Sequence, residues 1–483
     1  MKKRILSIVL AICLLLTLVP TMVFAEGEIT TAPSVSAYAT KTQLMDDTFA
    51  PDSSTGEAEN YGKLVFGKGV DIHGSYFEEE WHILGSDTGV GGDNTVIFAV
   101  SPMLFGYFEN EKNVNKTDSS LWSDCVYEGT TPTEVYPNHY GASDLRDTLQ
   151  DIATDTRFFT TAEQGLMNDT TVTTTDTLNN SDYTTTDKLY ALDGVLGEEI
   201  IYAGSDYQKT LANESYWNSG NDFWLRTPSV VKYNDVISAV PGYFTTAHVV
   251  NDDGTFAQPA LNLDLTDVLF SSAAPAKPSM DGPSYGTIAP NKAMALRLDG
   301  SSMNIGTVEY DPQTDIIKAQ KGTISSKVAL VVQGKNGEKD WFFSVRVDGE
   351  YSIDADVIKD AFGLSSVNFE KCKIWLETVG TDRMRYAVNG VEKIQTVDIT
   401  DIETPTANTA LDTSALCATK GVSSTTPSVT WTPAHTTAGY KTIYTASVTL
   451  SAKEGYVFTD SATATVNGNP ATSVTKIRME HLR

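Results

Sequence analysis

The chain has 483 residues, of which 41% are hydrophobic, 20% charged and 10% aromatic. This length suits about three domains of ~150 residues, and the composition can bury a sizeable core, which argues against a disordered chain. Acidic residues outnumber basic ones by 62 to 35, giving a formal net charge of -27. Because nucleic acid and anionic membranes repel so acidic a chain, we expect neither as a partner.

The first 25 residues have the pattern of an export signal. Residues 2–4, Lys-Lys-Arg, form a basic start, and residues 5–18 are almost purely apolar. Residues 23–25, Val-Phe-Ala, then place small side chains where a signal peptidase reads them. A retained membrane anchor is the alternative, because about 20 residues suffice to span a bilayer. We predict cleavage before Glu26, a secreted or cell-envelope location, and no membrane contact after cleavage.

Composition divides the rest of the chain into three modules. A leader rich in Thr, Ser, Ala, Asp and Glu comes first, the first linker is rich in Pro, Ala and Ser, and the second is acidic with Pro and Thr. The predicted order is signal peptide 1–25, flexible leader 26–58, first module 59–272, linker 273–285, second module 286–398, linker 399–408, third module 409–475 and basic tail 476–483.

The first module mixes strand and helix signals. Residues 81–84 and 94–100 are apolar and predict strands, whereas the segment from Ser143 to Ile152 begins with a capping residue and spaces its apolar residues helically. The Thr-rich stretch 170–186 is interpreted as an extended insertion or loop. Residues 223–228 predict another strand, and Asp253-Gly254 predicts a hairpin turn.

Five motifs follow one another in this module. They are Trp-x-x-Leu at 81–84, Ser-x-Leu-Arg at 143–146, Phe-x-x-x-Glu at 159–163, Trp-Leu-Arg-x-Pro at 224–228 and Pro-Ala-Leu-x-Leu at 259–263. In this order they resemble a family of exported domains of unassigned function that is common in Gram-positive gut bacteria. Two positions depart from the family pattern: Thr227 replaces a Ser, and Gln258 stands where an Arg often precedes Pro. More remotely, the order is similar to the C-type-lectin-like fold of formylglycine-generating enzymes.

The second and third modules carry mainly strand signals. In the second, Asn336-Gly337 predicts a hairpin between two apolar strands, and a short helix is expected between a capping Asp354 and Gly363. In the third, residues 444–452 alternate strictly between apolar and polar. This module resembles the immunoglobulin-like repeats of bacterial surface proteins. The expected fold class is therefore α+β: a C-type-lectin-like mixed domain followed by two β-rich modules, the last an immunoglobulin-like β-sandwich.

Cysteine and histidine patterns do not indicate a metal or redox site. Once the signal is removed, Cys125, Cys372 and Cys417 remain, an odd number without a Cys-x-x-Cys pair, and the histidines form no His-x-x-x-His spacing. The acidic turn 251–254 lacks the ligand spacing of an EF-hand calcium loop and is better interpreted as a hairpin turn. We predict no metal and no cofactor.

The candidate ligand-binding residues lie on and before the strand 223–228. Arg226 in an apolar strand needs a partner, which is either an internal carboxylate or a ligand. The loop 214–222 contains aromatic side chains and amides suited to sugars, although its Trp could equally cover the end of the core. The candidates are Trp217, Asn218, Asn221, Trp224 and Arg226.

Together these patterns predict a non-enzymatic, modular binding or adhesion protein. It is expected to recognise an extracellular ligand, a glycan or a protein, through its first module. The alternative is an extracellular carbohydrate-active hydrolase with accessory β domains, which requires two carboxylates in one cleft. The acidic run 78–80 is one possible source of such a pair, although a solvated surface explains diffuse acidity as well.

Overall fold

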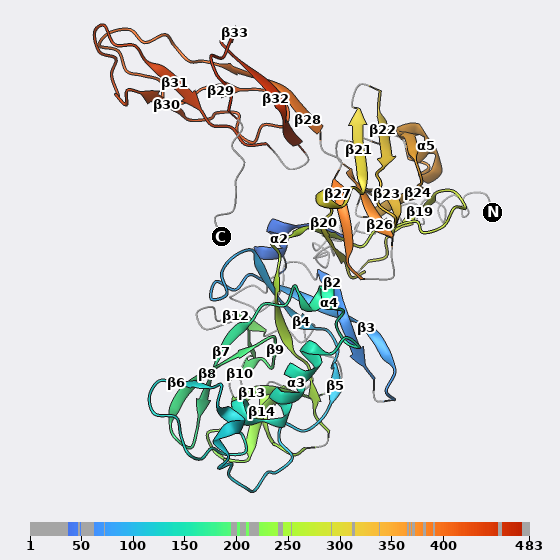
Figure 1. Cartoon of the computed structure of the whole chain (residues 1–483), viewed down its shortest axis with the longest axis vertical. Helices are drawn as coiled ribbons and strands as arrows, with labels where there is room; N and C mark the ends of the chain where they lie inside the picture. Colours follow the sequence, from blue (N-terminus) through green and yellow to red (C-terminus); the bar gives the residue numbers. More distant parts are fainter. Residues whose placement is uncertain are drawn as a thin grey trace, which may run out of the picture. The chain divides into compact units, whose positions relative to one another are not determined.

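The computed structural model describes residues 37–46, 49, 62–71, 73–194, 200–202, 209–211, 222–239, 245–252, 254–290, 292–311, 314–337, 339–364, 367, 369, 372–379, 383–389, 392–452 and 456–475. The predicted signal peptide, most of the leader and the basic tail lie outside these residues. The chain forms two compact units (Figure 1). Unit 1 contains the described residues up to Ala273 together with Ala289–Leu296, and unit 2 contains Ala274–Ile288 and the described residues from Arg297 onward.

The fold is mostly β, so the expected α+β class with a C-type-lectin-like domain is wrong. Strands account for 46% of the structure and helices for 11%, in many small sheets. Segments that the resemblance assigned to a mixed domain form strands, in keeping with their content of β-branched and aromatic residues. The four α-helices of the described residues are α2 (Lys41–Met45), α3 (Asp144–Thr154), α4 (Thr161–Gln164) and α5 (Ala355–Phe362).

Unit 1 is built around two five-stranded sheets. The first is antiparallel and its central strands are buried on both faces, which explains their nearly continuous apolar sequence. Its order is β2 (Lys63–Val70), β3 (Tyr76–Gly85), β4 (Asn94–Ala99), β17 (Ala260–Asp264) and β9 (Leu189–Tyr190). The order in the second is β15 (Thr245–Val249), β14 (Asp235–Ala239), β13 (Phe223–Pro228), β16 (Phe256–Ala257) and β5 (Leu104–Phe105).

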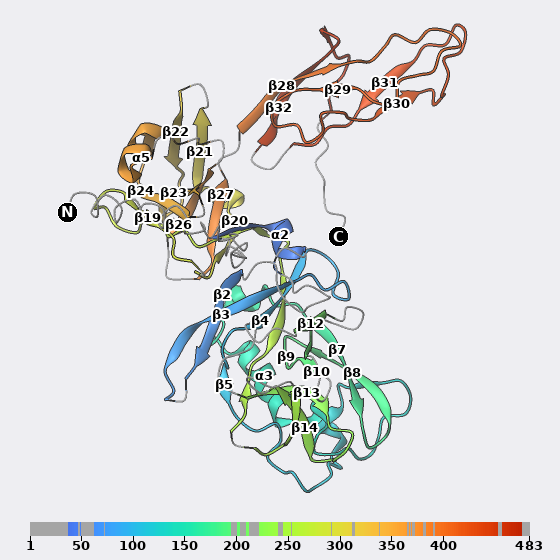
Figure 2. The same ribbon diagram turned by 180° about the vertical axis from the view of Figure 1, so that it is seen from behind.

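Smaller sheets complete unit 1, and one of them contains the Thr-rich stretch. This stretch is a regular hairpin rather than a loop, drawn in green in Figures 1 and 2. Threonine is β-branched and therefore favours a strand. The two three-stranded sheets are β6 (Val126–Tyr127), β8 (Ser181–Asp187) and β7 (Thr170–Asp176), and β10 (Asp193–Gly194), β11 (Ile200–Tyr202) and β12 (Lys209–Leu211). In addition, β1 (Tyr38–Thr40) pairs antiparallel with β18 (Val268–Ser272).

The helix predicted from Ser143 is confirmed as α3. Its backbone begins after the N-cap Ser143, whose Oγ accepts a hydrogen bond from the Arg146 N–H at 3.2 Å. The Phe-x-x-x-Glu motif is explained by α4, where Glu163 accepts hydrogen bonds from the N–H groups of Thr160 and Gly67. The short helical turns η1 (Ser119–Trp122) and η2 (Tyr140–Ala142) precede α3.

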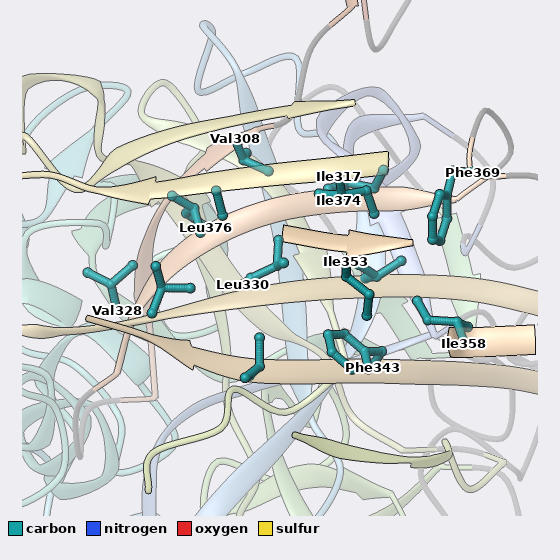
Figure 3. Packing of buried hydrophobic residues seen from close by; sticks show 14 of the residues in the cluster. Val308, Ile317, Val328, Leu330, Phe343, Ile353, Ile358, Phe369, Ile374 and Leu376 are labelled. Carbon is teal, nitrogen blue, oxygen red and sulfur yellow. The ribbon is translucent and has the colours of Figure 1, made fainter. Parts of the chain in front are cut away.

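Unit 2 begins with a twisted sheet whose apolar face is covered by a second sheet and α5. Figure 3 shows the core between them, where Leu330 and Phe343 face Ile317 and Ile353. The strands run in the order β20 (Ala295–Asp299), β27 (Arg385–Asn389), β26 (Lys373–Val379), β23 (Lys327–Asn336), β24 (Lys339–Val347) and β19 (Ser284–Thr287), with β21 (Gly306–Asp311), β22 (Ile316–Lys321) and β25 (Glu350–Asp354) in the covering sheet and a helical turn η4 (Ser301–Met303).

Two predicted local features of unit 2 are confirmed. Strands β23 and β24 form the expected hairpin, with Asn336 opposite Lys339 and Gly337 at a φ of 60°. Helix α5 begins after Asp354, whose side chain accepts from the Asp356 N–H, and ends at Gly363 in the left-handed conformation with a φ of 61°.

The remainder of unit 2 has its own small apolar core and two sheets. The expected alternation is present in its middle, where Ala446 and Val448 are half-buried while Thr445 and Ser447 are exposed. The first sheet has the order β29 (Leu416–Cys417), β28 (Glu392–Thr400), β32 (Tyr456–Val466) and β33 (Asn469–Pro470), and the second pairs β30 (Val429–Thr432) with β31 (Thr445–Val448).

Candidate functional site

Three of the five predicted binding residues, Trp217, Asn218 and Asn221, lie outside the described residues. Trp224 is on β13 and is fully buried. Its indole N–H donates to the Gly106 carbonyl at 2.9 Å, and its ring contacts Phe108 edge-on at 5.9 Å between centroids. In this position the Trp224 indole packs inside unit 1 and faces no ligand.

Arg226 is also buried on β13, and its guanidinium is bound by the protein itself. Its Nη2 pairs with Asp193 Oδ2 at 3.3 Å, and its Nη1 and Nε donate to the carbonyls of Ala191 and Thr173 at 3.1 and 3.2 Å. These partners come from two separate segments, residues 191–193 and β7. The partner of Arg226 is therefore an internal carboxylate, which was one of the two partners expected from the sequence.

The most concentrated polar chemistry in unit 1 surrounds His139, which the sequence did not single out. The ring of His139 is buried and stacks on Tyr183 with centroids 4.2 Å apart. Its Nε2 lies 2.7 Å from the Tyr127 hydroxyl, which in turn lies 3.3 Å from Asp176 Oδ2. A chain of hydrogen bonds thus joins η2, β6 and the β7–β8 hairpin.

The direction of this chain follows from the backbone. The Ala142 N–H donates to His139 Nδ1 at 3.1 Å, so Nδ1 carries no hydrogen and the neutral ring carries it on Nε2. His139 therefore donates to Tyr127, and Tyr127 donates to the Asp176 carboxylate. Burial, helped by the positive charges of Lys116 and Arg146, lowers the pKa of His139 to about 3, which keeps the ring neutral.

Cys125 lies beside this chain but is a poor nucleophile. Its thiol packs against Gly141 and leaves no room for a Cβ there. Burial raises the pKa of the Cys125 thiol to about 12, so the reactive thiolate is scarce at neutral pH. Because His139 has its lone pair engaged by Ala142, it cannot accept the thiol proton either. Cys125 and His139 are thus the residue types of a catalytic Cys–His pair, but the histidine is not placed to activate the thiol.

Arg146, the Arg of the Ser-x-Leu-Arg motif, makes hydrogen bonds to three segments around His139. Its Nε donates to Asp187 Oδ1 at 2.8 Å, and its Nη1 donates to the Gly141 carbonyl at 3.0 Å. The other end of its guanidinium binds both oxygens of Asp124. We call His139, Tyr127, Asp176, Arg146, Asp124 and Asp187 the polar cluster.

Next to the polar cluster, the loop 229–234 between β13 and β14 exposes apolar side chains. Val230 is 86% exposed and Val231 75%. Tyr233 at its end packs against Tyr136, with ring centroids 5.4 Å apart and the ring planes tilted by 39°. We call residues 229–234 the valine loop. Apolar side chains presented this far into solvent are typical of a surface that contacts another molecule.

The valine loop is held in place by the buried side chain of Asn138, the residue before His139. The Asn138 amide donates to the carbonyls of Ser229, Lys232 and Asp235 at 3.4, 3.3 and 3.1 Å. The loop also closes on itself through a hydrogen bond from the Ser229 N–H to the Asp235 carbonyl at 2.9 Å. The exposed valines are therefore carried by a fixed backbone.

The acidic run 78–80 does not form a carboxylate pair. Glu79 is 1% exposed, and burial raises its pKa to about 8. Because side chains alternate along a strand, Glu78 and Glu80 point to the opposite face of β3, and Glu80 pairs with Lys63. Glycoside hydrolysis needs two carboxyl groups, one as the acid and one as the base or nucleophile. The run 78–80 supplies only one that is suited to the role of the acid, the protonated Glu79.

The turn that follows β15 contains Asp252, whose Oδ1 accepts from the Gly254 N–H at 2.9 Å. The flanking strands β15 and β16 do not pair with one another, so the predicted hairpin at Asp253-Gly254 is wrong. His248 lies 3.3 Å from Asp252 and 3.9 Å from Asp222. Among the residues that the structure describes, no three His, Cys, Asp or Glu side chains are grouped to hold a metal ion.

No family model, no curated protein and no solved structure matches this chain. The resemblances to the exported bacterial family and to immunoglobulin-like repeats therefore stay predictions. In the described part of the chain, no helix has both the length and the apolar character needed to cross a membrane.

Proposed function

We propose that this protein is an exported, cell-envelope-associated or secreted binding protein that recognises an extracellular glycan or protein through unit 1 and catalyses no reaction. The export-type start and the strongly acidic composition support the location. The observation that carries the binding role is the valine loop, in which a buried amide fixes the backbone while two neighbouring valines stay almost fully exposed.

The energetics of the valine loop favour this role. Burying a valine side chain contributes about 1.5–3 kcal/mol. Val230 and Val231 forgo most of that gain within unit 1. A ligand that covers both would recover it, and because Asn138 already orders the backbone, little conformational entropy would be lost on binding.

The loop 214–222, which precedes β13 whereas the valine loop follows it, is a second and separate candidate contact region. Trp217, Asn218 and Asn221 belong to it, and its last residue, Asp222, is anchored by a hydrogen bond from the Phe256 N–H to its carbonyl at 2.9 Å. Phe256 contacts the half-exposed Phe105 edge-on at 5.2 Å. Exposed aromatic rings are suited to contact a sugar ring, and the sequence of the loop adds Trp and Asn residues, which are of the types that bind sugars.

The test compares three variants with the wild type in binding assays on a glycan array and a panel of extracellular matrix proteins. Replacing both Val230 and Val231 by Ser should weaken binding at least tenfold while leaving the melting temperature unchanged. Val114→Ser is the matched control, because Val114 is also exposed but lies outside the loop. Trp217→Ala measures the contribution of the second loop in the same assay.

Two results would contradict the proposal. Unchanged binding by the double valine variant would remove the role of the valine loop. Turnover of a glycan or peptide by the purified chain, abolished by a single carboxylate substitution, would favour the hydrolase alternative.

A further inference from the structure

The tip of the β2–β3 hairpin is held by few contacts. The ladder between β3 and β4 runs from Trp81 to Gly85, and beyond it the Val100 N–H donates to the Glu80 carbonyl at 2.8 Å. Among the described residues, 76–79 therefore pair with β2 alone. Figures 1 and 2 show this end of the hairpin, in blue, extending beyond β4. We call the described residues between 68 and 80 the hairpin tip. Two-stranded ribbons are marginally stable in water, so such a tip needs an anchor.

Glu79 is the side chain that anchors the tip to the segment after β4. Its Oε1 accepts a hydrogen bond from the Ser101 N–H at 3.2 Å, and beside it the Val70 N–H donates to the Met103 carbonyl at 3.0 Å. Its Oε2 is buried, packs over Gly69 and has no hydrogen-bond partner among the described residues. The carboxyl is thus enclosed by backbone and apolar groups.

No positive charge is placed to pair with Glu79 in the described part of its surroundings. On the hairpin itself, Glu78 and Lys68 are opposite one another on the other face. Glu80 is on that face too and is paired with Lys63. On α4, which contacts β2 through the Gly67 N–H, Glu163 is bound by Gly67 and Thr160. The segment 101–103, Ser-Pro-Met, carries no titratable group.

We propose that Glu79 is a proton-operated latch, which in its neutral form holds the hairpin tip against the segment 101–103 and on losing its proton lets the tip open. A buried carboxylate without a counter-charge is costly, whereas a neutral carboxyl is tolerated. Opening breaks the hydrogen bonds to Ser101 and Met103 and brings the carboxyl into water. It also breaks the hydrogen bond from the Val100 N–H to the Glu80 carbonyl and the edge-on contact between Tyr76 and Phe158.

The sign of the pH effect follows from linkage. In the closed tip, burial raises the pKa of Glu79 from 4.5 to about 8. In the open tip the carboxyl is in water and regains its ordinary pKa. Between these two values the open form has lost a proton that the closed form keeps, so the opening constant rises about tenfold for each pH unit. Below 4.5 and above about 8 the dependence disappears.

Hydrogen–deuterium exchange of the full chain at pH 5, 6, 7 and 8 measures this opening, after correction for the intrinsic exchange rates. Protection of the tip amides in the wild type should fall about tenfold per pH unit. Glu79→Gln cannot ionise and should show protection that is independent of pH. Glu78→Gln, the matched control on the exposed face, should keep the wild-type slope.

Either of two outcomes would overturn the latch. The first is protection of the wild-type tip that does not change from pH 5 to 8, which is decisive even if Glu79→Gln does not fold. The second is a Glu79→Gln tip that loses protection in parallel with the wild type. Neither outcome depends on ligand binding, so the latch and the proposed function fail independently.

Discussion

The polar cluster of unit 1 and the apolar core of unit 2 both hold buried side chains in place, but through different interactions. In the polar cluster, Arg146, Asp187 and His139 are buried and each has partners at hydrogen-bond distance. In the apolar core, Leu330 and Phe343 pack among other hydrocarbon side chains without a directional contact (Figure 3). Directional bonds specify one arrangement, whereas apolar packing depends mainly on volume.

This difference in interactions corresponds to the length of the paired strands in each region. The apolar core lies between long strands, and β23 pairs with β24 over its whole length. The polar cluster connects short pieces, among them the three-residue η2 and the two-residue β6. Where backbone ladders are short, side-chain ion pairs and hydrogen bonds must fix the geometry. In unit 1 the residue next to His139, Asn138, holds the valine loop in the same way.

The largest expected effect comes from breaking the buried ion pair of the polar cluster. Asp187→Ala removes the carboxylate that accepts from Arg146 Nε at 2.8 Å and leaves the guanidinium with Asp124, which is largely exposed. Removing one partner of a buried ion pair costs about 3–5 kcal/mol, and because Asp124 stays bound to Arg146 we expect the lower end of this range. Urea unfolding followed by exchange of unit 1 amides measures this loss. A loss below about 1 kcal/mol, equal to that of the exposed control Asp182→Ala, would show that the ion pair is dispensable.

In the apolar core, truncating a buried side chain should lower stability by leaving a cavity. Leu330→Ala removes a fully buried side chain from the middle of β23, and such truncations cost about 3 kcal/mol with the remaining cavity. The exposed Val357 on α5 offers a control, because Val357→Ala opens no cavity and should change stability by less than about 0.5 kcal/mol. Equal losses from the two substitutions would mean that the core relaxes around the gap.

The sequence could predict features that depend on a few neighbouring residues. The cap at Ser143, the turn at Asn336-Gly337 and the helix between Asp354 and Gly363 are all of this kind, and all three are confirmed. The fold class was wrong because it depends on which strands pair, and pairs such as β4 with β17 join residues more than 160 positions apart. The β-branched residues of the Thr-rich stretch would have allowed its strands to be predicted.

The candidate site was less predictable for the same reason. That Arg226 needs a partner follows from its apolar neighbours, but Asp193 as that partner is 33 residues away. The link between Tyr127 and Asp176 spans 49 residues. For the valine loop, the available signal was a pair of valines in the short connection between two apolar strands. Connections between strands are usually polar, so an apolar pair there predicts exposed apolar side chains.

The smallest of the expected effects is a pH dependence that the polar cluster has and the apolar core lacks. Burial holds the pKa of His139 at about 3 in the folded protein, whereas an unfolded histidine has a pKa of 6.5. As the pH falls below 6.5 the unfolded chain gains a proton that the folded chain does not. The free energy of unfolding therefore decreases by about 1.4 kcal/mol per pH unit, or about 2 kcal/mol by pH 5.

His139→Phe tests this, because it keeps an aromatic ring against Tyr183 and cannot be protonated. The variant should be less stable than the wild type at pH 8, where it lacks the hydrogen bonds to Ala142 and Tyr127, and the difference should shrink by about 2 kcal/mol between pH 6.5 and 5. Using the difference cancels the contribution of Glu79, which has the opposite sign. Leu330→Ala serves as the reference from the apolar core, with a difference from the wild type that is constant over the same range. A constant difference for His139→Phe as well would mean that His139 titrates alike in the folded and unfolded chains, and that the cluster does not keep its ring neutral.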